Sequence, residues 1–143
     1  MAYWLLKSEP YKFSWDDQCE KGEGRWEKRV RNYQARNNLA AMKPGDQGFF
    51  YHSNEGKEIV GIIEITKEAY TDPDPEKNEN GKFVTVDVKP LHPLENTVTL
   101  ADLKAHPFLS QMKVVKQVRL SVSPVTDEEW REVCAIGGVK QAA

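Results

Sequence analysis

The chain of 143 residues contains only two cysteines, Cys19 and Cys134, and neither has the spacing of a zinc site or of a CxxC redox motif. We interpret them as free thiols in a reducing compartment, which excludes a disulfide-stapled fold. No apolar run approaches the roughly 20 residues that a membrane-spanning helix requires. The N-terminus also lacks the basic segment of a signal peptide. These absences predict a cytoplasmic protein that has no contact with a membrane.

The sequence also lacks an excess of charge of either sign. Twenty Lys and Arg residues stand against 22 Asp and Glu residues, which gives a formal net charge of −2, and the isoelectric point is near 5.9. Domains that coat nucleic acid through bulk charge are strongly basic. This class is therefore excluded, and any binding of nucleic acid is expected at one spot.

Catalytic signatures are missing as well. The chain has no GxSxG, HExxH or Walker sequence and no dinucleotide-binding fingerprint. We therefore expect no cofactor, no metal ion and no catalytic residue. A cysteine–histidine pair remains an open alternative, because such partners need to meet only in space.

The length of the chain suits a single domain over residues 1–143. Apolar and alternating runs predict strands over residues 3–7, 48–53, 59–66, 83–89 and 114–122. Helices are predicted over residues 34–42 and after the capping residues Ser14, Thr99 and Thr126. Strands with short intervening helices predict an α+β fold on a mostly antiparallel, curled sheet, and we expect a small β-barrel with short flanking helices.

Residues 25–36 form a basic spot on this acidic protein, with five cations against the single acid Glu27. Trp26 and Tyr33 offer flat aromatic faces there, while Asn32 and Gln34 offer paired donors and acceptors. A nucleobase needs a surface for stacking and an amide or carbonyl at its edge. The alternative is structural, because aromatic rings usually pack in a core and charge runs are usually solvated.

Polar residues follow two of the predicted strands. Ser8 and Glu9 come after the first strand, and His52 and Ser53 end the strand that begins at residue 48. Hydroxyl and imidazole groups suit a base edge or a phosphate, so these residues are candidates to line one mouth of the barrel. Strand ends also become polar simply because they meet water, and that alternative remains open.

Three segments and the C-terminal region resemble the EVE domain, a small PUA-like family. The segments are Tyr-Trp-Leu-Leu-Lys-Ser-Glu-Pro at 3–10, Val-Arg-Asn-Tyr-Gln-Ala-Arg-Asn-Asn-Leu at 30–39 and the Phe-Tyr-His-Ser strand within 48–54. The strand at 119–122 and the helix through Trp130 extend the resemblance over almost the whole chain. It implies a PUA-like barrel whose pocket accepts a modified base, such as 5-methylcytosine or 5-hydroxymethylcytosine in DNA, while relatives with this barrel read modified bases in RNA.

Carried onto this chain, the resemblance implies a role for each candidate residue. Tyr33 and Trp26 would stack on the base, and Asn32, Ser8 and Ser53 would bond its edge, with Gln34 beside them. Lys7, Glu9 and His52 would shape the mouth, and Arg31 or Arg36 would hold flanking phosphates. The expected protein is a monomeric, non-enzymatic reader of modified DNA or RNA that leaves action to a separate effector protein.

Two rival functions stay open at this point. Other PUA-like barrels of similar size carry a Lys, Glu and hydroxyl site in the same mouth, so Lys7 and Glu9 could serve a small amidase-like enzyme. A protein-interaction module that takes a peptide in an aromatic groove is the third alternative.

Overall fold

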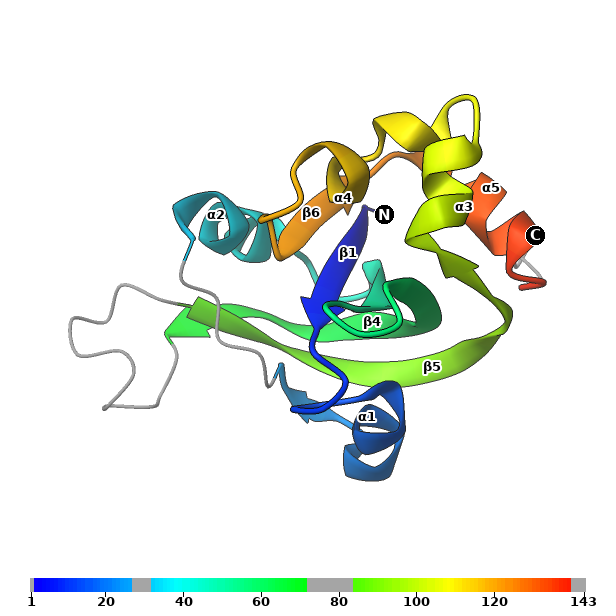
Figure 1. Cartoon of the computed structure of the whole chain (residues 1–143). Helices are drawn as coiled ribbons and strands as arrows, with labels where there is room; N and C mark the ends of the chain where they lie inside the picture. The colour runs from blue at the N-terminus through cyan, green and yellow to red at the C-terminus, as the bar shows by residue number, and fades with distance from the viewer. Residues whose placement is uncertain (1, 27–31, 72–83, 140–143) are drawn as a thin grey trace.

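A computed structural model describes residues 2–26, 32–71 and 84–139, which form a mixed α+β fold (Figure 1). The elements, in chain order, are β1 (Tyr3–Ser8), α1 (Trp15–Lys21), β2 (Gly24–Arg25), α2 (Tyr33–Ala41), β3 (Gln47–His52), β4 (Glu58–Thr71), β5 (Val84–Thr99), α3 (Leu100–Ala105), the 3₁₀ helix η1 (Leu109–Gln111), α4 (Lys113–Lys116), β6 (Val122–Val125) and α5 (Asp127–Ile136). Within these ranges, no helix is both long and apolar enough to cross a membrane.

The six strands form one sheet in the order β2-β5-β4-β3-β1-β6. Neighbouring strands run antiparallel except β1 and β3, which are parallel. The predicted α+β class and mostly antiparallel sheet are confirmed. The predicted barrel is not, because β2 and β6 are the two edges of an open sheet among the described residues. With only two residues, β2 offers too short an edge to close the sheet on β6.

Successive strand residues point to opposite sides of the sheet, and helices pack on both of these faces. Leu6 and Phe50 lie in one core cluster with Trp15 of α1 and with residues of α2. Leu5 and Phe49 belong to a second cluster with residues of α3, α4 and α5. Figure 1 shows α3, α4 and α5 gathered at one end of the molecule, with α1 at the opposite end. Along β1 and β3, consecutive residues therefore meet different groups of helices.

The predicted helix starts are confirmed at three capping boxes. The side chains of Ser14, Thr99 and Thr126 each accept a hydrogen bond from the backbone N–H three residues later. The acid at that later position in turn accepts from the backbone N–H of the capping residue. These reciprocal bonds satisfy donors that the first helical turn leaves open, so α1, α3 and α5 begin where the sequence places them.

The strand predicted over residues 114–122 is wrong. Residues 113–116 form α4, and β6 starts only at Val122. The β-branched valines favour a strand locally, but Val114 is buried in the second core cluster from a helical turn. The segment between α4 and β6 is consequently a loop at the end of the sheet, and it proves important for the site.

Candidate functional site

The parallel pairing of β1 with β3 brings the carboxyl ends of both strands side by side at one end of the sheet. We call this place the sheet edge, as distinct from the outer strands β2 and β6. Lys7 lies opposite Tyr51 in this register, and Ser8 lies opposite His52. The turn after β3 and the loop between α4 and β6 meet at this edge and enclose a pocket of about 350 Å³. We call it the strand-end pocket. It is lined by Lys7, Glu9, Tyr51, Ser53, Asn54, Lys57, Leu100, Val114, Val118, Arg119 and Ser121.

Lys7 supplies a partly desolvated cation to this pocket. Its Nζ donates a hydrogen bond of 2.8 Å to the carbonyl oxygen of Val118 and lies 5.8 Å from the centre of the Tyr51 ring. Burial lowers the pKa of the Lys7 ammonium and raises the pKa of the Tyr51 hydroxyl to about 12. At neutral pH the Tyr51 hydroxyl is therefore a donor, and Lys7 anchors the loop that forms the pocket rim.

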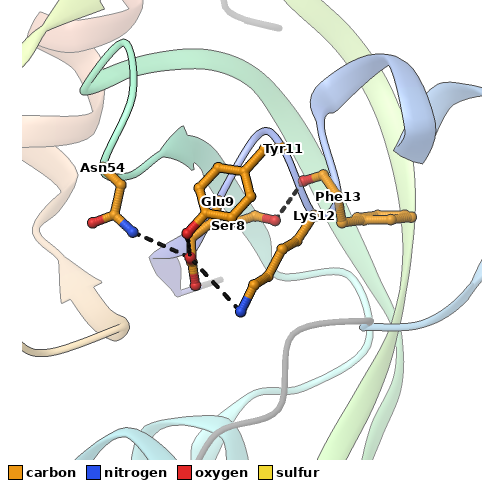
Figure 2. Close-up of polar contacts among 6 residues, drawn as sticks. All are labelled: Ser8, Glu9, Tyr11, Lys12, Phe13 and Asn54. Atoms are coloured by element: carbon orange, nitrogen blue, oxygen red, sulfur yellow. Dashed lines mark hydrogen bonds and ion pairs between the residues drawn. The ribbon is translucent and has the colours of Figure 1, made fainter.

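Glu9, which also lines the pocket, organises its surroundings through several polar contacts (Figure 2). Its Oε2 accepts hydrogen bonds from Asn54 Nδ2 at 3.1 Å and from the Tyr11 hydroxyl, and it lies 3.9 Å from Lys12 Nζ. The backbone N–H of Ser53 also donates to the carbonyl oxygen of Ser8 at 2.9 Å. These bonds hold the turn after β3 against the end of β1, so this part of the pocket is positioned before any ligand arrives.

Two candidate residues, Ser8 and His52, face the other side of the sheet. The Ser8 side chain is 1% exposed, and its hydroxyl donates to the carbonyl oxygen of Phe13 (Figure 2). His52 Nε2 accepts a 3.0 Å hydrogen bond from the backbone N–H of Trp15. Burial lowers the pKa of His52, and the carboxylates of Glu58 and Asp16 oppose that shift. Both residues support α1 and its approach, which differs from the base-binding roles expected for them.

Trp26 lies in the core. It is 3% exposed, and its ring packs edge-on against Phe50 with 5.4 Å between ring centres. A base can stack only on an open ring face, so this position disagrees with the stacking role expected for Trp26.

The described residues of the basic segment do not line the strand-end pocket. Asn32 is the N-cap of α2, where its Oδ1 accepts a 3.1 Å hydrogen bond from the backbone N–H of Ala35. Tyr33 is 57% exposed, while Arg36 is partly buried. Arg31 falls outside the described residues. Neither Asn32 nor Tyr33 lines the strand-end pocket, so a concavity shared by these residues and the strand tips stays a prediction.

A second depression does include two of these residues. This adjacent hollow has a volume of about 340 Å³. It is lined by Asn32, Gln34, Lys116, Gln117, Val118, Arg119 and Leu120. Val118 and Arg119 line both cavities, so the loop before β6 divides the hollow that holds Asn32 from the pocket that holds Lys7.

Several lining residues were missed by reasoning from the sequence. Tyr51 lies opposite Lys7 in the β1–β3 pair, but the parallel pairing of these strands could not be deduced from the sequence. Arg119 and Ser121 were assigned to a strand that does not form. The signal that could have revealed them is the Lys-Val-Val-Lys spacing of residues 113–116, which places both lysines on one helical face.

The open mixed sheet, with a pocket at the ends of two parallel strands, defines a small α+β domain. The model of the EVE domain matches residues 2–136 of the chain. Thymocyte nuclear protein 1 of Gallus gallus is 38% identical over 165 residues, which cover 94% of this chain and 68% of that protein. The chain belongs to the EVE domain family.

Solved structures agree with this assignment. A protein of Agrobacterium tumefaciens is 48% identical with a TM-score of 0.93, and the match covers 99% of this chain and 97% of that chain. Human THYN1, in a crystal structure in complex with 5-methylcytosine-containing DNA, is 34% identical with a TM-score of 0.86; the match covers 99% of this chain and all of that chain. The names of the animal relatives refer to a nuclear protein, so the cytoplasmic location stays a prediction.

Proposed function

We propose that this protein binds nucleic acid and accommodates one modified base, a modified cytosine in DNA, in the strand-end pocket. The observation that carries the proposal is the pocket itself, which holds Lys7, Tyr51 and Arg119 at one sheet edge. Support comes from human THYN1, a relative whose crystal structure contains DNA with 5-methylcytosine. A volume of about 350 Å³ lies at the small end of the roughly 300–1,000 Å³ typical of ligand pockets.

The lining has the groups that a cytosine edge and its backbone need. Asn54 and Ser53 provide an amide and a hydroxyl, which can donate and accept at a base edge. Tyr51 and Val114 provide apolar surface on which a methyl group can rest. Lys7 and the exposed Arg119 supply positive charge for a phosphate. Three kinds of contact therefore converge on one cavity.

Energetics argue that these contacts must act together. Extracting a base from a duplex costs a few kcal/mol, whereas a methyl group in an apolar niche contributes only about 1–3 kcal/mol of discrimination. Edge bonds and phosphate contacts have to supply the remainder. The domain is therefore proposed to bind with modest affinity and strong salt dependence, and to leave any action on the DNA to a separate effector.

Fluorescence anisotropy with labelled oligonucleotides tests the proposal. The panel compares plain, methylated and hydroxymethylated cytosine in DNA and in RNA, which also addresses the RNA-reader alternative. Asn54→Gly suits the pocket, because Asn54 has a φ of 66° and glycine keeps that backbone conformation while removing the amide. We expect about tenfold weaker binding from Asn54→Gly or Arg119→Ala, in line with the loss of one charged or edge contact.

Arg131→Ala is the matched control, because Arg131 is an exposed arginine on α5 that does not line the strand-end pocket. It should bind as the wild type does. Equal affinity for all cytosine forms, unchanged by Asn54→Gly and Arg119→Ala, would remove the proposal.

The enzymatic alternative retains one supporting observation. Lys7 and Glu9 both line the strand-end pocket, and burial lowers the pKa of Lys7. Turnover of an acylated nucleoside that is lost in Lys7→Met would favour it, whereas a nucleoside panel that yields no product would reject it.

A further inference from the structure

The adjacent hollow lies immediately across the loop before β6 from the strand-end pocket. Val118 and Arg119 line both cavities, and the carbonyl oxygen of Val118 is held by Lys7 Nζ at 2.8 Å. The loop that separates the two cavities, which we call the divide, is thus held by Lys7 of the strand-end pocket. A ligand longer than the strand-end pocket can extend into the hollow by crossing this divide.

The hollow has the chemistry of a nucleotide site. Lys116 and Arg119 bring two cations, and Gln34 and Gln117 bring amides that can read a base edge. Val118 is 64% exposed at the divide, and covering its methyl groups with a ligand would remove apolar surface from water, which is favourable. Cations, amides and an apolar contact therefore occur together in this second cavity as well.

We infer that the adjacent hollow binds the nucleotide next to the accommodated base on the same strand, with Arg119 at the phosphate that links the two nucleotides. This inference rests on the proposed function of the strand-end pocket. A base in that pocket carries its neighbour by covalent connection, and the linking phosphate must pass over the divide. The planar guanidinium of Arg119 matches a phosphate in a bidentate manner. The recognised unit is then two nucleotides, and the identity of the flanking base affects binding.

The test compares ligands of increasing length on the full chain. The probes are the 5-methylcytosine mononucleotide, dinucleotides with each of the four bases on either side, and a longer oligonucleotide. The wild type should bind its preferred dinucleotide more tightly than the mononucleotide, and should discriminate among flanking bases about fivefold, the low end for an amide–base contact.

Variants on one helix and its neighbours provide matched pairs. Lys116→Ala and Gln117→Ala alter the hollow, whereas Lys113→Ala and Gln111→Ala remove exposed side chains of the same types that do not line it. Lys116→Ala should lower the salt dependence of dinucleotide binding by about one phosphate contact. Gln117→Ala should flatten the flanking-base preference, and both should leave mononucleotide affinity unchanged. The two controls should behave as the wild type throughout.

The outcomes separate the two levels of the argument. Mononucleotide and dinucleotides that bind equally well, with no flanking-base preference, would overturn the inference and leave the proposed function standing. Equal effects of Lys113→Ala and Lys116→Ala would also overturn it, because they would indicate a diffuse charge effect. A wild type that binds none of the modified probes removes the proposed function and this inference with it. Circular dichroism melts of all variants confirm that they are folded.

Discussion

Two pairs of polar side chains lie next to each other where β1 and β3 end, and they have different roles. Lys7 and Tyr51 line the strand-end pocket, while the neighbouring pair, Ser8 and His52, bonds to the start of α1 and the segment before it. The two pairs are consecutive along both strands: Ser8 follows Lys7, and His52 follows Tyr51. Because side chains alternate between faces of a sheet, this single step moves a polar group from a cavity to a structural contact.

Polarity at a strand end does not by itself indicate a binding residue. On the face toward α1, the Ser8 hydroxyl and His52 Nε2 are hydrogen-bonded to backbone groups, namely the Phe13 carbonyl and the Trp15 N–H. On the pocket face, Lys7 bonds to a carbonyl of the rim loop, and Tyr51 is buried but reaches the cavity. The distinction can be tested by breaking each face separately.

The largest effect is expected from breaking the core behind α1. Phe50 is fully buried, with ring centres 5.5 Å from Trp15 and 5.4 Å from Trp26. Phe50→Ala should lower the free energy of unfolding by about 3–5 kcal/mol through a cavity, as measured by urea denaturation. Gly61→Ala is a graded companion, because a β-carbon at Gly61 would lie 2.6 Å from the Trp15 ring; it should cost about 1–3 kcal/mol. Losses below 1 kcal/mol for Phe50→Ala would contradict this packing.

His52 should make the α1 face sensitive to acid. Burial places the folded pKa of His52 below its unfolded value of about 6.5. Its stabilisation is therefore fully present above about pH 6.5 and is lost as the pH falls through the folded pKa. His52→Ala leaves the Trp15 N–H without this acceptor, which should cost about 1–3 kcal/mol at pH 7.5. Urea unfolding at pH 7.5 and pH 5.5 should show a smaller loss on acidification for the variant than for the wild type, and equal losses would refute this role.

A smaller and more diagnostic contrast comes from the neighbours Ser8 and Lys7. Ser8→Ala removes the buried bond to Phe13 and should cost about 1 kcal/mol of stability while leaving affinity for modified DNA unchanged. Lys7→Met keeps the length of the side chain and should change stability by less than about 1 kcal/mol. It should weaken DNA binding about tenfold, as expected for the loss of one charge-assisted contact. The reverse pattern of effects would show that the two faces have been assigned the wrong way round.

Local rules predicted much of the fold. Helix starts follow from Ser14, Thr99 and Thr126, because capping bonds form within four residues. The parallel pairing of β1 with β3 could not be predicted, since it depends on contacts between segments more than 40 residues apart.

The site was predictable only in part for the same reason. Lys7, Glu9 and Ser53 do line the strand-end pocket, but their common edge results from the unpredicted pairing. Arg119 was missed because local β-propensity favoured a strand where the tertiary structure has α4 and a loop. Trp26 is expected from the sequence to stack on a base, with packing in the core as the alternative, and long-range packing on Phe50 buries it.

The smallest effect concerns Asn32, where capping and binding can be separated. Asn32 Oδ1 caps α2 through the Ala35 N–H, so Asn32→Ala should cost about 1 kcal/mol of stability whether or not Asn32 contacts DNA. Asn32→Ser retains a capping oxygen and should keep stability within a few tenths of a kcal/mol, yet it removes the amide NH₂ from the adjacent hollow. Anisotropy titrations should then show a loss of about two- to fivefold for oligonucleotides and none for the mononucleotide. Should Asn32→Ser bind every probe as the wild type does, Asn32 serves α2 alone, as Ser8 and His52 serve α1.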